Sequence, residues 1–461
     1  MSLSVFGLAV LAICGYLLFF RGPLSLLASV MLFSLLGGSA AIVLTALGGA
    51  SVRPELLAIV ILSAAVCAPG AGRAQLMPSA IMNNFPLVVF CVYGAATAFI
   101  LPRLFAGEFQ LVPLNPRALT SRFDTAPLHF TPQNITTAFY LLATMMAALA
   151  AWIAVQHKAA ARTLVLVAII VGAVHVALGL ADLVLTGTPL DAVLEFFRNA
   201  NYAQHNQAMD GFIRINGIFP EPSAYATFAL PWFVLNFELW LRNISPVATG
   251  FTAAGLLSVL SLSLSSTAIV GLVIYFVIFA VRCALVPSSL KPSFFLVAGA
   301  VGVFFVLAGL SLALVSPEFV HTVTDLFLGL TVEKSETSSG VQRLAWARQG
   351  VDLFVSTYGV GVGAGSFRSS SMITAIMGSS GVIGLATFLW FLFAVMKPLH
   401  ATTYRLGPSE RDNVGAALSW SMLGAVLPAS FASASLDPGV VFGVFSGASL
   451  GLRRSDFAMA A

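Results

Sequence analysis

The segment "RINGIFPEPSAYATFALP" (214–231) carries two charges, Arg214 and Glu221, directly before a long apolar run. An arginine offers a planar fork of donors that suits phosphate oxygens. Glu221 precedes Pro222 and Ser223, a helix-start signature. The positive end of a helix favours an ionised carboxylate, which can accept a proton. The pair can therefore hold an anion and take up a proton. The structural alternatives are helix-start stabilisation for Glu221 and snorkelling to lipid headgroups for Arg214.

A second concentration of charge lies in 316–370, where Lys334 is the only lysine. The candidate anion-binding arginines of the chain are Arg198, Arg214, Arg343, Arg348 and Arg368. Arg348 and Asp352 are four residues apart, so on a helix they can simply pair with each other. Arg343 has no acid at such a spacing. Arg343, Arg348 and Arg368 make 316–370 a second candidate part of the site.

The composition indicates an α-helical membrane protein that carries these two segments. Of 461 residues, 59% are hydrophobic and 9% are charged, against about 25% charged in soluble domains. The apolar runs are continuous and near the length of about 20 residues that a membrane-spanning helix needs, which excludes a barrel of short alternating strands. Four cysteines without metal-like spacing indicate no disulfide framework.

We expect an all-α polytopic protein of about 12–14 transmembrane helices. The predicted spans are 3–20, 24–48, 55–69, 80–101, 135–156, 163–186, 223–241, 246–264, 267–286, 293–315, 371–396, 413–431 and 437–452. The first run has no basic start and no obvious cleavage site, so we interpret it as a retained span.

Basic residues in short loops predict the orientation of the spans. They lie at Lys158, Arg162, Arg242, Arg282, Lys291, Lys397, Arg405, Arg411, Arg453 and Arg454. If these residues face the cytoplasm, four segments lie on the outer side of the membrane: 102–134, 187–222, 316–370 and the turn at Asp437. Within the two larger outside loops, 190–197 and 341–357 have apolar residues at helical spacing. These short amphipathic helices either frame a site at the membrane surface or only cap the bundle.

Two motifs resemble a known family. "RINGIFPEPSAYA" followed by a span, and "SSGVQRLAWARQGVDLFVSTYGVGVGAGSF" followed by "GVIGLATFLWF", resemble the large loops of the O-antigen polymerase and O-antigen ligase superfamily. Fifteen residues separate Arg343 from Gly359, similar to the Arg-fifteen-Gly motif of Wzy-type polymerases. The resemblance covers about 187–396. It divides the chain into N-terminal helices (1–186), a catalytic region (187–396) and C-terminal helices (397–461).

The chain also departs from this family. The 187–222 loop has no second Arg-fifteen-Gly motif, because counting from Arg198 lands on Arg214. Ligases typically carry a histidine after the glycine-rich turn, whereas none lies between Arg368 and Gly381. His321 precedes the motif and is not its equivalent. The departure favours a polymerase, with a ligase as the alternative.

The resemblance implies a GT-C-like enzyme of the bacterial inner membrane that acts at the periplasmic face. Its substrates would be oligosaccharides on undecaprenyl pyrophosphate, and its partners membrane lipids, a chain-length regulator and a flippase, with no nucleic acid. It would need no cofactor and no metal. The implied catalytic residues are Glu221 as the base, with Arg214 and Arg343 on the pyrophosphate. Arg198, Arg348, Arg368, Gly359 and Tyr225 would bind substrate, and Asp325 and Glu318 are reserve bases.

Other classes fit less well. "GVGVGAG" (359–365) lacks the strand–helix unit of a nucleotide site, and a tight turn explains its glycines. A transporter or flippase would suit a dozen spans and Pro231 within 223–241. Transporters, however, place polar residues near the bilayer midplane, whereas here they concentrate in the outside loops. An enzyme is the favoured interpretation.

Overall fold

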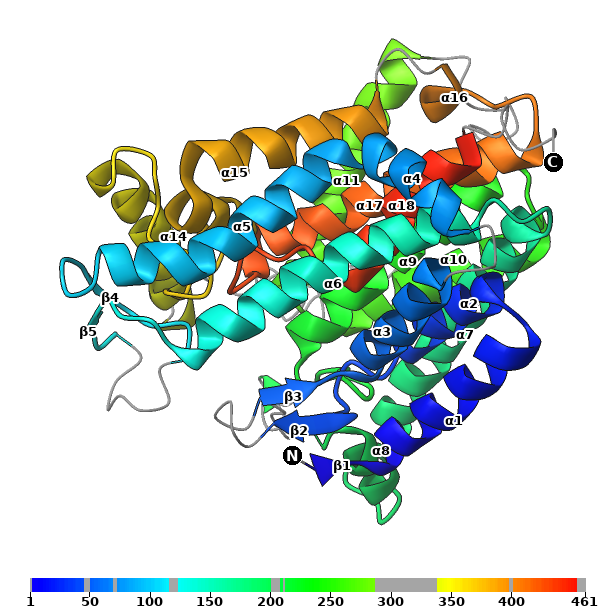
Figure 1. Ribbon diagram of the computed structural model, residues 1–461. Coiled ribbons are helices and arrows are strands. Elements are labelled where there is room, and N and C mark those ends of the chain that lie inside the picture. Colours follow the sequence, from blue (N-terminus) through cyan, green and yellow to red (C-terminus); the bar gives the residue numbers. More distant parts are fainter. Residues whose placement is uncertain are drawn as a thin grey trace.

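The computed structural model is predominantly helical (Figure 1). It describes residues 2–44, 50–68, 73–115, 123–199, 208–209, 212–286, 338–397 and 401–453. The predicted span 293–315 and the reserve bases Glu318 and Asp325 lie outside the described residues.

Six of the described helices are long and apolar enough to cross a membrane. They are α5 (Phe85–Leu104), α6 (Pro132–Ala154), α7 (Ala160–Leu185), α11 (Ser266–Leu285), α15 (Met372–Met396) and α17 (Glu410–Ala432). Shorter apolar helices are α1 (Val5–Phe20), α2 (Pro23–Phe33), α3 (Pro54–Cys67), α10 (Pro246–Leu262) and α18 (Val440–Arg453). α9 (Pro222–Leu241) has the length of a span but carries Asn236 and Glu238 and is buried over most of its length. These helices are compatible with a multi-pass membrane protein.

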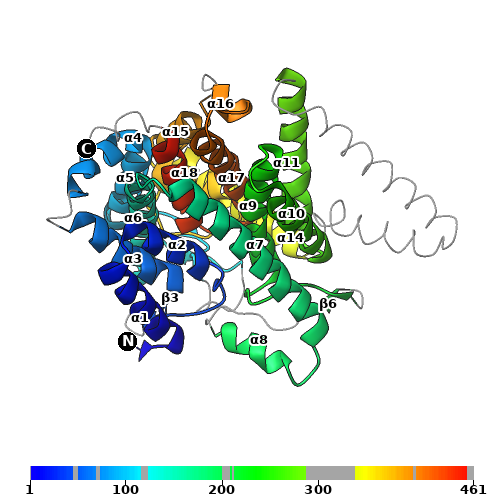
Figure 2. The same cartoon turned by 90° about the vertical axis from the view of Figure 1, so that its right-hand side faces the viewer.

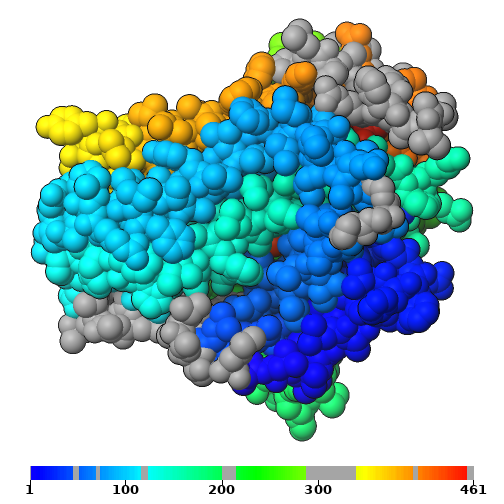
Figure 3. Space-filling model, in the orientation of Figure 1, coloured from blue at the N-terminus to red at the C-terminus, as the bar shows by residue number. Residues whose placement is uncertain are grey.

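Both predicted amphipathic segments are helical. They correspond to α8 (Asp191–Phe197) and α14 (Ser338–Ser356). Two further short helices are α4 (Met77–Asn83) and α16 (Ala401–Tyr404). In Figure 3 the N-terminal helices, coloured blue to cyan, form most of the visible face, and α14 and α15, in yellow and orange, border it.

The predicted span 24–48 is wrong over residues 34–44, the part of its second half that the structure describes. α2 ends at Phe33, and Ile42–Leu44 form a strand, β2, between β1 (Ser2–Leu3) and β3 (Ala50–Val52). The break lies at Gly37 and Gly38, where a Cβ would come within 2.4 Å of the Phe219 ring and 2.2 Å of the Ile218 carbonyl oxygen. The chain turns there because another segment packs directly on its backbone. Two further pairs of short strands, β4 (Gln110–Leu111) with β5 (Ala126–Pro127) and β6 (Ala208–Met209) with β7 (Phe212–Ile213), form separate two-stranded sheets, so the chain is not purely α.

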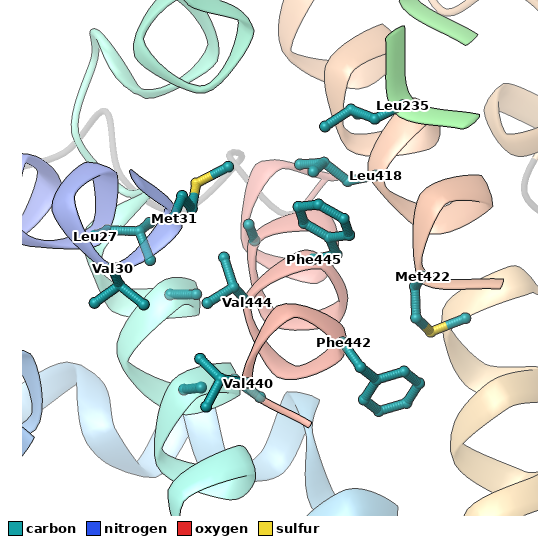
Figure 4. Packing of buried hydrophobic residues seen from close by; sticks show 14 of the residues in the cluster. Leu27, Val30, Met31, Leu235, Leu418, Met422, Val440, Phe442, Val444 and Phe445 are labelled. Carbon is teal, nitrogen blue, oxygen red and sulfur yellow. The ribbon is translucent and has the colours of Figure 1, made fainter. Parts of the chain in front are cut away.

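α18 forms the centre of the core. Figure 4 shows its Val440, Val444 and Phe445 between side chains of α2 on one side and of α9 and α17 on the other. Against α6 the contact is made by backbone, because a Cβ on Gly447 would lie 2.0 Å from the Ala148 carbonyl oxygen. Gly443 and Gly451, four residues to either side, come similarly close to the α6 backbone. This is the small-residue spacing that lets apolar helices pack closely in membranes.

The segments predicted to lie on opposite sides of the membrane gather at opposite ends of the helices. At one end, the backbone N–H of Arg368 donates to Val112, that of Ser369 to Ala434, and the Ser39 hydroxyl to Phe197. At the other end, Arg411 donates to the carbonyls of Val155 and His157, Arg242 to Arg405 and Arg453 to Val395. Figure 2 shows α8 at the first end and α16 at the second. We call them the cavity end and the basic end, since the cavity described below lies at the former.

Candidate functional site

A cavity of about 500 Å³ lies where α3, α9 and α18 begin. This volume is within the range of small-molecule sites. Its polar lining consists of Ser34, Ser51, Arg53, Glu55, Tyr140, Glu221, Ser223, Thr227, Ser433, Ser435 and Asp437. Glu55, Glu221 and Asp437 each lie within three residues of the first residue of one of these helices. The positive ends of three helix dipoles therefore meet beside these three carboxyl groups.

Glu221 occupies the N-cap position of α9 without using its side chain as a cap. Its backbone is extended, with φ −160° and ψ 158°, and its side chain makes no hydrogen bond to the helix backbone. Instead, the Ser223 hydroxyl donates to Oε1. Glu221 therefore contributes no capping hydrogen bond to the helix, and its carboxylate lines the cavity.

The turn 214–221 is held by a buried ion pair. The carboxylate Oδ2 of Asp182 accepts the backbone N–H groups of Asn216 and Gly217 at 2.9 and 3.0 Å. Arg198 pairs with Oδ1 of the same carboxylate, and its Nε donates to the Gly217 carbonyl at 2.8 Å. Both side chains of the pair are 1% exposed. Arg214 and Glu221, at the two ends of this turn, are thus positioned by the hydrogen bonds of Asn216 and Gly217, which lie between them in the sequence.

Apolar residues of the same turn fix its other face. Ile215, Ile218 and Phe219 are buried in a cluster with Leu194 of α8 and Tyr225 of α9. In "RINGIF", the residues after Arg214 anchor the backbone of the turn, and this anchoring positions Arg214.

Arg214 interacts electrostatically with two other predicted site residues. Burial lowers the pKa of the Arg214 guanidinium, the charge of Glu221 opposes this shift, and the charge of Arg343 adds to it. Arg343 belongs to α14, more than a hundred residues further along the chain. The charge of Arg214 is therefore influenced by both Glu221 and Arg343. Of these three residues, Glu221 is the one that lines the cavity. Two neighbouring guanidinium groups repel each other, and an anion between them would relieve that repulsion.

The start of α14 is anchored against the cavity wall. The Ser370 hydroxyl donates to the Arg343 carbonyl. The neighbouring Ser369 donates its backbone N–H at 3.1 Å to the carbonyl of Ala434, which lines the cavity. Arg368 lies over the ring of Trp346, 4.5 Å from its centroid, and its carbonyl accepts from the side chain of Gln349. Arg368 therefore holds α14 against the segment that contains Arg368, through contacts with Trp346 and Gln349.

None of the five predicted substrate-binding residues, Arg368 included, lines the cavity. Arg198 forms the buried ion pair with Asp182 described above, so its role is to position the turn 214–221. Tyr225 is fully buried, where it stacks on His175 with 3.9 Å between ring centroids and donates to the His175 carbonyl. Arg348 is 77% exposed and pairs with Asp352 at 3.9 Å. The pairing that the spacing of these two residues suggested is therefore present.

Gly359 ends α14 in the left-handed conformation. With φ +81°, it donates its N–H to the Phe354 carbonyl at 2.8 Å, and its own carbonyl accepts from Val382 of α15 at 2.9 Å. This is the usual role of a glycine after a helix. It confirms that the glycine-rich segment 359–365 is a tight turn against α15, so Gly359 shapes the loop rather than the cavity.

Sequence reasoning missed a second set of polar residues in the cavity lining, Arg53, Glu55, Tyr140 and Asp437. Nε of Arg53 pairs with Oε1 of Glu55 at 3.0 Å, and the Tyr140 hydroxyl lies within the electrostatic influence of Arg53, Glu55 and Asp437. A signal for them exists: "RPE" at 53–55 and "DPG" at 437–439 both resemble "EPS" at 221–223, an acid beside a proline at the head of an apolar run.

Within the ranges that the structure describes, no three His, Cys, Asp or Glu side chains are grouped as metal ligands would be. No protein-family model, curated protein or solved structure matches this chain.

Proposed function

We propose that this protein is a polysaccharide polymerase of the bacterial inner membrane. It transfers a growing glycan from undecaprenyl pyrophosphate to a hydroxyl group of another lipid-linked repeat unit. The reaction takes place at the cavity end, which faces the periplasm.

The observation that carries this proposal is that Glu221 lines the cavity while Arg214 interacts electrostatically with both Glu221 and Arg343. The first two offer guanidinium groups from separate loops, the arrangement that a diphosphate with several oxygens needs. Glu221 offers a carboxylate that the start of α9 favours in its ionised form. One group for the leaving anion and one for the acceptor proton are the two requirements of this transfer.

The chemical step balances with these residues alone. The acceptor oxygen bonds to the anomeric carbon of the growing glycan while its proton passes to Glu221. The bond between that carbon and the pyrophosphate oxygen breaks, and its electron pair leaves on undecaprenyl pyrophosphate. Arg214 and Arg343 compensate the charge that develops there. The positioned turn 214–221 supplies this geometry before substrate arrives.

The two loop motifs that resemble O-antigen polymerases and ligases support the same class of reaction. The lack of a histidine between Arg368 and Gly381 favours the polymerase over a ligase that acts on a different acceptor. A transporter receives less support, because Glu55, Glu221 and Asp437 line a cavity at the helix starts, not in the middle of the spans.

The test is a reconstitution. We would incubate the purified protein in nanodiscs with lipid-linked repeat units and a chelator, and resolve the products by size. We expect a ladder of glycans that differ by one repeat unit, with undecaprenyl pyrophosphate released. Transfer of single units only to a foreign acceptor lipid would indicate a ligase, and protein that consumes no lipid-linked unit would overturn the proposal.

A further inference from the structure

The part of the cavity lining formed by Ser51 and Glu55 carries buried polar atoms that have no hydrogen-bond partner among the described residues. Oε2 of Glu55 and the hydroxyl of Ser51 have no hydrogen-bond partner within the described ranges. Glu55 is 3% exposed and Ser51 8%, and both line the cavity. A buried carboxylate oxygen without a donor is costly, so this wall is complete only when a ligand supplies donors.

The neighbouring start of α18 offers a second carboxyl group. Asp437 accepts the Thr144 hydroxyl at 2.7 Å and the Gly439 N–H at 3.2 Å, and both donors reach Oδ1. Oδ2 of Asp437 has no hydrogen bond among the described residues, so it too is placed for a donor in the cavity. The Tyr140 hydroxyl interacts electrostatically with the carboxyl groups of both Glu55 and Asp437.

The balance of charge specifies the ligand. Three carboxyl groups, on Glu55, Glu221 and Asp437, line the cavity together with one guanidinium group, on Arg53, which is already paired with Glu55. An anion would be repelled here, unlike beside Arg214 and Arg343. A ligand with several hydroxyl donors and no negative charge fits, since ionised carboxylates only accept hydrogen bonds.

We infer that the wall formed by Ser51, Glu55, Tyr140 and Asp437 is the subsite for the acceptor sugar, and that it selects a neutral sugar residue over an acidic one. The inference rests on the proposed function and adds to it the identity of the acceptor end. Glu55 and Asp437 accept hydroxyl groups of the sugar ring, which presents another hydroxyl to Glu221 across the cavity. A uronic acid in the same place would set its carboxylate against theirs.

The test measures binding without transfer. The wild-type protein in nanodiscs, with no lipid-linked donor present, is titrated with methyl glucoside and separately with the methyl glycoside of glucuronic acid, and binding is followed by saturation-transfer NMR. We expect the neutral glycoside to bind at least tenfold more tightly. Equal or tighter binding of the glucuronide would overturn the inference, and this comparison needs no variant that could misfold.

Two variants locate the site. Glu55→Gln and Asp437→Asn should weaken neutral-glycoside binding at least tenfold, while Glu410→Gln, an exposed acid in the first turn of α17 at the basic end, should not. In polymerisation assays the first two should raise KM for the acceptor more than they lower kcat. Wild-type binding in both would overturn the inference even if the protein polymerises. Glycoside binding that needs Glu55, in a protein that polymerises nothing, would instead overturn only the proposed function.

Discussion

Arg214 and Arg343 are the residues whose proposed role depends most on side-chain shape. If both contact a pyrophosphate through the planar fork of guanidinium, Arg214→Lys and Arg343→Lys should each lower polymerisation at least tenfold while protein levels stay unchanged. Arg348→Lys is the matched control, because Arg348 is exposed and paired with Asp352. Turnover is measured from lipid-linked units. Full activity in Arg343→Lys would remove phosphate binding from its roles.

Asp437 links the cavity to stability. Burial raises the pKa of its carboxyl group above the ordinary 3.8, and Thr144, Gly439 and Arg53 oppose the shift. A group that holds its proton more tightly when folded adds stability at acid pH, and that stability is lost as the pH rises through the folded-state pKa. Asp437→Asn cannot ionise, so it should unfold at a higher temperature than wild type near neutral pH. The difference should shrink toward the ordinary carboxyl range; a gain that is constant with pH would contradict this.

At the residue scale, sequence reasoning predicted Arg214, Arg343 and Glu221 as one group, and in the structure Arg214 interacts electrostatically with both of the others. It could not separate them from Arg198, which looked like a similar loop arginine. The difference lies in Asp182, whose carboxylate reaches Arg198 across the fold. Pairing between distant residues leaves no local pattern.

At the scale of elements, the turn 214–221 positions Arg214 and Glu221, and the buried Asp182–Arg198 ion pair holds the backbone of this turn in place. Asp182→Ala leaves a buried guanidinium and two backbone N–H groups without their acceptor. It should therefore cost about 3–5 kcal/mol of unfolding free energy and abolish polymerisation. Asp352→Ala, which breaks an exposed pair of the same type, should cost under about 1 kcal/mol. Thermal and denaturant unfolding in detergent measure both. Equal, small losses would show that the buried pair does not fix the turn.

Most helices could be predicted from apolar run length, including α15 and α17 to within a few residues. The failure at 24–48 has a physical cause. Hydropathy does not register the role of Gly37 and Gly38. Because these residues have no side chain, Phe219 and Ile218 can pack directly against the backbone there. The tight packing of α18 on α6 was equally invisible, although its glycines recur every fourth residue. Local propensity predicts where a helix forms, whereas contacts with distant segments decide where it stops.

For the whole molecule, the arrangement of charges at two ends predicts its orientation in the membrane. In a background with the exposed Cys67 replaced by serine, Ser356→Cys at the end of α14 should react with a membrane-impermeant maleimide in intact cells. Leu406→Cys at the basic end should react only after permeabilisation. Both positions are exposed. The reverse pattern would place the cavity in the cytoplasm, away from the proposed substrate.

The most direct test of the account is the turnover of Glu221→Gln beside Glu410→Gln. Both change an acid at the start of a helix, so any effect through the helix dipole is matched. Glutamine preserves size but cannot take up a proton. With purified protein, lipid-linked repeat units and a chelator, Glu221→Gln should polymerise about 10²-fold more slowly or worse, with acceptor-sugar binding intact and Glu410→Gln near wild type. Asp325→Asn and Glu318→Gln complete the series. A fully active Glu221→Gln protein would contradict the assignment of Glu221 as the base.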